Sequence, residues 1–412
     1  MIPRVLGIGT AVPPAAASQL QAARLAVETT LLDPDQHALV QGLYKRAGVS
    51  TRGSALLTST TPHHLPVDQS FFPPSLASTP SPASSTPAAA APQPWPTTRQ
   101  RMAAFPQLAT PMALAAARQA LDHAAAAPGS ITHLVTVSCT GMHAPGVDVA
   151  LVRELGLHPG VQRLNIGFMG CHGGIVAART AAALAAAPTQ ASDPSGPSRP
   201  PPRILAVCIE LCTLHLQRTD RAEQHVANAL FADGAAAIVV GPSNQSPSAD
   251  PSPATSPAPH IRSSSSMLFD DSITAMGWTI GDHGFEMTLD RRVPEVLAAG
   301  LGPWIWPWLR QELGSAVQPD DLRWAVHPGG PRILAAIETA LNLGPTALAH
   351  SRTVLSDHGN MSSATVLFIL RRMLHQGTAE APADAAADTR PIVMLAFGPG
   401  LTGEAALLTV ED

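Results

Sequence analysis

Short apolar runs alternate with longer apolar stretches along most of the chain. Two alanine-rich stretches, residues 110–126 and 173–187, are apolar around most of their circumference, which predicts buried helices. Five shorter runs are rich in β-branched or other apolar residues, as is typical of strands buried on both faces. These runs are residues 133–139, 203–211, 235–241, 322–328 and 392–398. Alternation of buried strands and helices predicts an α/β fold.

Two stretches in different halves of the chain echo each other. Residues 161–184 contain "NIGFMGCHGG", and we interpret them as a strand, a turn of small residues and an apolar helix. Residues 352–374, which contain "DHGNMSSATV", have the same order. Cys171 and Asn360 occupy equivalent places, each just before its helix. The echo indicates a duplicated unit whose two helix N-termini face one shared site.

Four segments are biased in composition, and most of the prolines lie in the first three. Such segments bury little apolar surface, so we interpret them as surface loops that are largely disordered. They are residues 54–97, 187–203, 242–265 and 376–390. We expect an N-terminal half of residues 1–241 with insertions at 54–97 and 187–203, a linker or insertion at 242–265, and a C-terminal half of residues 266–412.

Bulk composition narrows the classes of function. The 412 residues are 45% apolar and carry a formal net charge of −5, which leaves no broad basic surface for nucleic acid or anionic membrane. There is no run of eighteen apolar residues and no signal-peptide pattern, so we expect no membrane span and a cytoplasmic location. The four cysteines show neither zinc-site spacing nor a disulfide framework.

Three residues could carry covalent chemistry. Cys171 precedes a helix, where backbone N–H groups and the helix dipole favour a thiolate, although a buried structural cysteine is an equally good interpretation. His327 ends a strand in "WAVHPGG", a position more often held by a structural histidine. Asn360 could cap a helix, and it could also donate, with a histidine, to a developing oxyanion.

Taken together, these residues suggest two classes of enzyme. A cysteine protease uses Cys, His and Asn in this order, whereas a decarboxylating condensation of thioesters uses the same three residue types. Against the protease stand the missing export signal, the strands buried on both faces and the absence of a Cys-Trp pattern at the nucleophile. The repeated, buried α/β pattern favours the condensing enzyme.

Five motifs stand in the order and spacing found in type III polyketide synthases, the chalcone synthase-like family. They are "GCHGG" (171 is the cysteine), "LFADGAAAIVVG" (230–241), "VHPGGPRIL" (326–334), "HGNMSSATVLFIL" (358–370) and "FGPGLTGE" (397–404). The chain resembles this family over nearly everything except the four biased segments, and its bacterial branch more than its plant branch. The resemblance implies a thiolase-like fold of two pseudo-repeated halves, layered α-β-α-β-α.

The resemblance also implies a set of site residues. The catalytic triad falls on Cys171, His327 and Asn360, and a gatekeeping phenylalanine falls on Phe231, while Met287 replaces a second one. Arg46 matches one of the basic residues that hold the coenzyme A phosphates. Lys45 and Arg52 are further candidates. Cavity-lining and cavity-shaping positions fall on Cys139, Cys212, His215, Ser362 and Pro399, with Trp278 and Gly400 beside them.

The implied reaction is the iterative condensation of malonyl-CoA onto an acyl-CoA starter. Cys171 carries the acyl group, and a His327 imidazolium lowers the pKa of its thiol. The resemblance implies no cofactor besides coenzyme A thioesters. It also implies a homodimer, in which residues 140–148 reach the partner's cavity with Ala144 at the place of a family methionine.

The starter is the least constrained part of the prediction. Because the chain has few aromatic residues, and because Tyr44 lies outside the cavity motifs, we expect a medium or long fatty acyl-CoA and an alkylpyrone or alkylresorcinol product. A 3-oxoacyl-carrier-protein synthase of fatty-acid initiation and a polyketide synthase using a small starter or malonyl-CoA alone remain alternatives. A non-catalytic scaffold on the same fold is a third.

Overall fold

The computed structural model describes residues 2–30, 34–58, 69–73, 94–187, 201–242, 258–375 and 388–410. Its centre is a nine-stranded sheet in the order β11-β12-β13-β8-β1-β7-β6-β4-β5. These strands are β1 (Pro3–Ala11), β4 (His133–Ser138), β5 (Gln162–Gly167), β6 (Ile204–Leu211), β7 (Asp233–Pro242), β8 (His260–Leu268), β11 (Arg323–Val326), β12 (Ile392–Gly398) and β13 (Thr402–Thr409). The two parts of the sheet meet at β1 and β8, where Arg4 pairs with His260.

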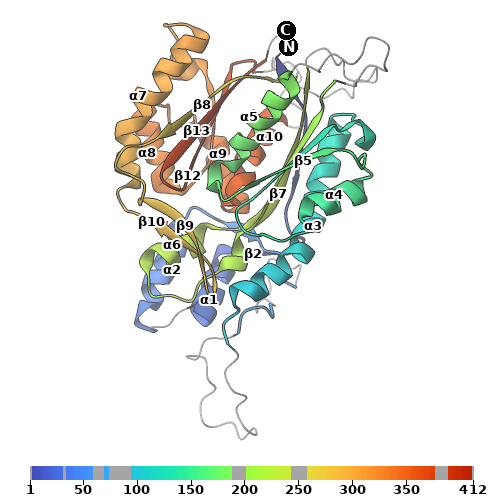
Figure 1. Ribbon diagram of the computed structural model, residues 1–412. Coiled ribbons are helices and arrows are strands. Elements are labelled where there is room, and N and C mark those ends of the chain that lie inside the picture. The colour runs from blue at the N-terminus through green and yellow to red at the C-terminus, as the bar shows by residue number, and fades with distance from the viewer. Residues whose placement is uncertain are drawn as a thin grey trace, which may run out of the picture.

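Side chains alternate across each half of the sheet and build three packed cores. Even-numbered residues of β6 and β12 face α5 (Gly173–Ala186) and α10 (Thr365–His375) in a shared central core. Odd-numbered residues of β6 face α3 (Thr98–His123) and α4 (Val147–Leu155). Those of β12 face α7 (Val293–Leu313) and α8 (Pro331–Leu341). Figure 1 shows α5 and α10 between the two outer helix pairs, which confirms the predicted α-β-α-β-α layering.

Smaller elements gather at the lower end of the sheet in Figure 1. Helices α1 (Gln19–Thr30), α2 (His37–Arg46) and α6 (Ala222–Leu230) lie there with two antiparallel strand pairs, β2 (Ala16–Ser18) with β3 (Thr51–Gly53) and β9 (Met276–Gly281) with β10 (Gly284–Leu289). Short 3₁₀ turns are η1 (Pro34–Gln36), η3 (Pro128–Ser130), η4 (Gly170–His172), η5 (Cys212–His215), η6 (Pro319–Asp321) and η7 (Ser362–Ala364). Among the described helices, none is long and apolar enough to cross a membrane.

The predicted strand at the start of residues 352–374 is wrong. This stretch belongs to helix α9 (Ala349–His358), whose buried residues Ser351, Val354 and Leu355 follow the three- and four-residue spacing of a helix face. The repeat survives in the order of elements. The first half runs β4-α4-β5-η4-α5-β6-β7 and the second runs β11-α8-α9-η7-α10-β12-β13, so α9 takes the place of β5. The boundary between the halves at residue 241 stays a prediction.

Two of the segments interpreted as disordered contain ordered structure. Within residues 54–97, the rings of Phe72 and Trp95 are buried and stack at a centroid distance of 4.9 Å, and the Arg101 guanidinium lies over Phe72. Aromatic burial therefore orders parts of a segment that is rich in Pro, Ser and Thr. In residues 242–265, the last six belong to β8, which pairs with β13. Residues 59–68, 74–93, 188–200, 243–257 and 376–387 lie outside the described residues.

Candidate active site

Cys171 lies in η4, immediately before α5, and is half-buried. Gly170 precedes it with φ +73°, and a side chain at Gly170 would collide with Pro399, so only glycine allows the loop at Pro399 to pack this closely. The thiol therefore sits on a tight turn at the N-terminus of a buried helix, as the sequence predicted. The backbone dipole of that helix favours negative charge at this end.

Asn360 lies beside this cysteine, at the end of α9. Its Oδ1 is 4.0 Å from the Cys171 Sγ and accepts a hydrogen bond of 2.8 Å from the Ser362 backbone N–H. Its backbone is held on both sides, because its N–H donates to the Leu230 carbonyl and its carbonyl accepts from Ala232, each at 2.9 Å. With Oδ1 occupied, Nδ2 forms no hydrogen bond with any described residue. It is a positioned donor of the kind that stabilises a developing oxyanion.

His327 ends β11, where its backbone N–H donates to the Leu395 carbonyl of β12 at 2.8 Å. The side chain is 2% exposed, and neither ring nitrogen has a hydrogen-bond partner among the described residues. Both ring nitrogens are therefore open to a further hydrogen-bond partner. His172, the neighbour of Cys171, is close enough to influence its pKa.

Burial shifts the pKa values of Cys171 and His327 in opposite directions. It raises the pKa of the Cys171 thiol to about 12, against the lowering effect of hydrogen bonds with Ser362 and Asn360. It lowers the pKa of His327 to about 3, and His172 adds to that lowering. Both shifts favour the neutral forms, a thiol at Cys171 and an uncharged imidazole at His327. The expected pairing of a thiolate with a His327 imidazolium stays a prediction.

Two cavities share part of their lining near Cys171. The smaller, of about 30 Å³, is lined by Cys171 together with Cys139, Thr140, Gly170, Cys212, Phe231, Met276, Gly277, Trp278, Met287, Ser362 and Pro399. The larger, of about 70 Å³, shares Cys212, Phe231 and Trp278 with it. The rings of Phe231 and Trp278 lie 6.1 Å apart, centroid to centroid. These two side chains thus form part of the wall between the cavities.

Most predicted cavity residues line one of the two cavities. Cys139, Cys212, Phe231, Met287, Ser362 and Pro399 line the smaller one, whereas His215 lines the larger. His215 is also fully hydrogen-bonded: Nε2 donates to the Thr140 carbonyl at 2.7 Å, and Nδ1 accepts from the Phe285 N–H at 3.0 Å. The backbone N–H of Gly400 donates to the Met276 carbonyl at 2.8 Å.

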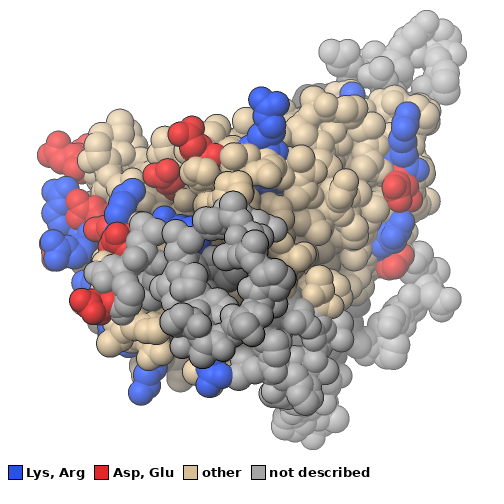
Figure 2. Space-filling model, turned by 90° about the horizontal axis from the view of Figure 1, so that it is seen from below, with Lys and Arg blue, Asp and Glu red and all other residues tan. Residues whose placement is uncertain are grey.

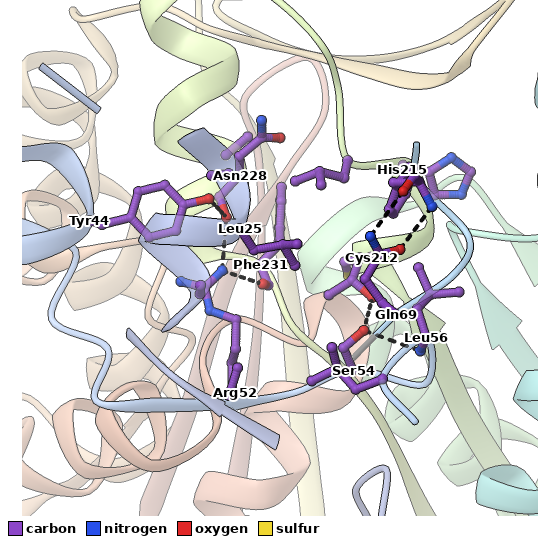
Figure 3. A pocket seen from close by; sticks show the side chains of 18 of the residues that line it. Leu25, Tyr44, Arg52, Ser54, Leu56, Gln69, Cys212, His215, Asn228 and Phe231 are labelled. Carbon is purple, nitrogen blue, oxygen red and sulfur yellow. Dashed lines mark hydrogen bonds between the residues drawn. The ribbon is translucent and has the colours of Figure 1, made fainter. Parts of the chain in front are cut away.

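The larger cavity corrects the interpretation of the aromatic residues. Tyr44 and Phe72 line it together with Phe231 and Trp278, so aromatic rings are not scarce there, and Tyr44 reaches the cavity although it stands outside the sequence motifs. Figure 3 shows Tyr44 and Phe231 on one side of this cavity, with His215 and Cys212 opposite. Tyr44 comes from α2, far in sequence from the motifs, and no spacing rule could have placed it.

The basic candidates for coenzyme A separate into exposed and buried side chains. Arg52 is 5% exposed, and its guanidinium donates to the carbonyls of Asn228 at 2.8 Å and Phe231 at 3.0 Å at the end of α6. It therefore holds the backbone of the cavity wall, and its proposed role in phosphate binding is wrong. Lys45 and Arg46 are exposed on α2 and line neither cavity.

A buried acid close to Cys171 was missed by sequence reasoning. Glu210 is fully buried on β6 and accepts hydrogen bonds from the Cys139 N–H (3.0 Å), the Thr140 hydroxyl (2.7 Å) and the Ser363 hydroxyl. Burial raises its pKa, and its charge raises the pKa of Cys171. The available signal was a lone acid in the otherwise apolar strand "ILAVCIEL".

The visible charges do not form a basic field. Seen from below, the molecule shows Lys and Arg side chains interspersed with Asp and Glu around the edge of this face (Figure 2). Any polyanionic group would therefore meet individual basic side chains, such as those on α2, rather than a continuous basic surface.

Comparison with known proteins gives matches over most of the chain. Residues 88–244 match the family model described as chalcone and stilbene synthases, N-terminal domain, and residues 260–410 match the C-terminal domain of the same family. "Alpha-pyrone synthesis polyketide synthase-like Pks18" of Mycobacterium tuberculosis is 31% identical over 404 residues, which cover 98% of this chain and 90% of that protein.

Solved structures show the same architecture. PKS-I from the brown alga Ectocarpus siliculosus is similar with a TM-score of 0.81 and 25% identity, covering 100% of this chain and 98% of that one. The C-terminal type III polyketide synthase domain of "Steely1" from Dictyostelium has a TM-score of 0.77 and 27% identity, covering 100% and 99%.

Proposed function

Because the chain belongs to the chalcone and stilbene synthase family and is a type III polyketide synthase, we propose that it extends a medium or long fatty acyl-CoA with malonyl-CoA. The product is an alkylpyrone or an alkylresorcinol. One observation carries this proposal: the larger cavity presents a mainly apolar wall, because nearly all of its polar side chains are already hydrogen-bonded within the protein. The name of the mycobacterial relative, which refers to alpha-pyrone synthesis, points in the same direction.

The chemistry begins with transfer of the acyl group to Cys171. Since burial favours the neutral thiol and the neutral imidazole, the Cys171 thiol passes its proton to His327 as its sulfur attacks the acyl-CoA carbonyl. Coenzyme A then leaves as the thiol, and the acyl group remains as a thioester on the cysteine. His327 accordingly acts as a base during loading, and its unpaired ring nitrogens are consistent with that role.

Chain extension uses two hydrogen-bond donors, His327 and Asn360. His327, neutral again after giving its proton to coenzyme A, and the Asn360 Nδ2 each donate an N–H to the thioester oxygen of malonyl-CoA. Loss of carbon dioxide leaves an enolate whose negative charge these donors stabilise. The enolate carbon attacks the Cys171 thioester and forms a β-ketoacyl-CoA, and the cysteine sulfur leaves as a thiolate. Repetition of the cycle extends the chain by two carbons each time.

The apolar wall distinguishes an alkyl starter from a phenolic one. The Tyr44 hydroxyl donates to the Asn228 carbonyl at 3.1 Å. The Gln69 side-chain amide donates to the Phe72 carbonyl and accepts from the Phe72 N–H. A phenolic starter would bury its hydroxyl without a partner, which costs about 1–3 kcal/mol. An alkyl chain needs only apolar surface, worth about 0.8 kcal/mol for each buried CH₂.

Measurement of kcat/KM against starter length tests the substrate class. With malonyl-CoA saturating, kcat/KM should rise from a C4 to about a C10–C12 acyl-CoA, since each added CH₂ contributes its burial energy. Mass spectrometry of the products identifies the number of extensions. A flat or falling profile, or a preference for coumaroyl-CoA over every fatty acyl-CoA, would contradict the proposal.

One observation favours a smaller starter as the second candidate. The cavity at Cys171 is only about 30 Å³, and Phe231 and Trp278 stand between it and the larger cavity. A short acyl group, or malonyl-CoA serving as its own starter, fits this space without any movement of the wall. Product formation from malonyl-CoA alone, undiminished when fatty acyl-CoA is added, would identify this case.

Arg46 is proposed to contact the coenzyme A phosphates, and a substitution of the buried Arg52 serves as the control. Arg46→Ala should raise KM for acyl-CoA about two- to fivefold, the worth of one exposed ion pair, without changing kcat. It should not affect an N-acetylcysteamine thioester, which has no phosphates. Arg52→Met should destabilise the fold by about 3 kcal/mol or more, because several carbonyls lose their donor, and should slow both thioesters alike. Equal effects of Arg46→Ala on both thioesters would contradict phosphate binding.

A homodimer is proposed from the exposed edge of the sheet. Strand β5 is the last strand of the sheet, and most of its side chains are exposed, including Leu164. An exposed strand edge is a template for pairing with a second chain. Met142 and Ala144, in the segment expected to reach the partner, are exposed as well. Light scattering at micromolar concentration should give twice the 42.6 kDa chain mass, and Leu164→Arg should lower it. A monomeric wild type would contradict the proposal.

A further inference from the structure

His172, which follows Cys171, connects two segments that line the smaller cavity: the turn at Gly170 and Cys171, and the loop at Pro399. The side chain is 2% exposed, and its Nε2 lies 2.7 Å from the Thr402 Oγ1. The Thr402 hydroxyl donates its single hydrogen to the Pro399 carbonyl at 3.1 Å. Nε2 must therefore carry a hydrogen and donate it to Thr402. The result is a directed chain of two hydrogen bonds from His172 through Thr402 to Pro399, which lines the cavity.

The segments joined by this chain are also in direct contact. A side chain at Gly398 would collide with the His172 imidazole, just as one at Gly170 would collide with Pro399. The turn that carries Cys171 and the loop that carries Pro399 therefore pack directly against each other. Small changes in one must move the other, because close-packed surfaces transmit displacement.

The chain of hydrogen bonds does not depend on charge. Burial lowers the pKa of His172 to about 4, and Arg179 adds to the lowering, so the imidazole is neutral at neutral pH. Arg179 itself is paired with Glu404 of β13 at 3.1 Å. The segment formed by η4 and α5 is thus attached to β13 twice, by the ion pair of Arg179 and by the neutral bond between His172 and Thr402.

We propose that His172 is a positioning residue that, through Thr402 and Pro399, holds the cavity wall in register with Cys171 during chain extension. This rests on the proposed condensation. Decarboxylation of malonyl-CoA needs His327 and Asn360, whereas carbon–carbon bond formation also needs the Cys171 thioester aligned with the enolate. When this alignment is lost, an enolate that does not attack the thioester takes up a proton instead. Malonyl-CoA and a proton then give acetyl-CoA and carbon dioxide without condensation.

The coupling ratio, the number of condensations for each carbon dioxide released, tests this inference. His172→Met and His172→Gln are near in shape, and only glutamine can donate to Thr402. Thr402→Val removes the hydroxyl. Thr409→Val, on the same strand, is its matched control, because the buried Thr409 hydroxyl has no partner among the described residues. Carbon dioxide, acetyl-CoA and polyketide are measured together at saturating substrate, with the thermal midpoint of each variant.

The expected result is a coupling ratio about fivefold lower in His172→Met and in Thr402→Val, the factor carried by one lost hydrogen bond. His172→Gln should recover most of the ratio, and Thr409→Val should keep the wild-type value. The double variant His172→Met/Thr402→Val should be no worse than either single one, since both act on one chain.

The outcomes separate failure of this inference from failure of the proposed function. A wild-type protein that forms no polyketide from any acyl-CoA would refute the proposed function. If the wild type condenses normally and Thr402→Val keeps the wild-type coupling ratio, the positioning role of His172 is wrong. The same holds if His172→Gln and His172→Met lose coupling equally.

Discussion

Replacing Cys171 with alanine should abolish acyl loading and polyketide formation while malonyl-CoA decarboxylation persists. Without the thiol there is no covalent acyl intermediate, so condensation should fall by at least about 10³-fold. His327 and Asn360 should remain in place to stabilise the enolate, because main-chain hydrogen bonds hold both residues and the Ser362 N–H also holds the Asn360 side chain. Radiolabelled acyl-CoA measures loading, and carbon dioxide release measures decarboxylation.

Cys208→Ala is the matched control for this substitution. Cys208 is buried in the central core and lines neither cavity, so its removal should leave acyl loading intact. Iodoacetamide should modify Cys171 in this control and in the wild type, and prior loading with acyl-CoA should protect it. Polyketide formation by Cys171→Ala at a rate near that of the wild type would falsify the nucleophile assignment.

The second large effect should come from Asn360. Asn360→Asp retains an oxygen that can accept from the Ser362 N–H but replaces the Nδ2 donor with a second carboxylate oxygen. Loss of one oxyanion donor costs about 3–4 kcal/mol, which is roughly a hundred- to a thousandfold in rate. Decarboxylation and condensation should both fall by this factor, unlike in Cys171→Ala, whereas acyl loading should change much less.

The comparison of Asn360→Asp with Asn360→Ala separates chemistry from structure. Alanine also removes the acceptor for Ser362, so it should lower the thermal midpoint more than aspartate does. If Asn360→Asp decarboxylates malonyl-CoA at the wild-type rate, Nδ2 is not the enolate donor, and the hydrogen bond to Ser362 would be the main role of this residue.

Much of the architecture was predictable, because each buried strand is a nearly unbroken apolar run. The helix at the start of residues 352–374 was not, since a short stretch with apolar residues fits both a helix face and a strand. Burial of Ser351, Val354 and Leu355 decides for α9, and burial depends on what packs against the segment. Composition similarly concealed Phe72 and Trp95, whose stacking orders part of a segment rich in prolines.

The site was predictable where a residue stands in a motif and unpredictable where burial decides its role. Cys171 and Asn360 lie next to each other, as their equivalent positions before two helices suggested. Arg46 and Arg52 are only six residues apart, yet one is exposed and the other holds the end of α6. Tyr44 reaches the larger cavity from a distant helix. Sequence alone also does not show how deeply a side chain is buried. The raised pKa of Cys171 and the lowered pKa of His327 could therefore not be foreseen.

The backbone of Phe231 has a consequence for how such an enzyme can diversify. Its main chain pairs with that of Asn360 and is held by Arg52, while its side chain lines both cavities. Main-chain bonds form whatever side chain the residue carries. Mutation can therefore remodel the partition between the cavities and leave the amide beside the nucleophile undisturbed. The side chain of this residue thus affects which substrate fits, whereas its main chain helps to hold the reactive site. Position 231 is therefore a natural starting point for directed evolution of substrate range.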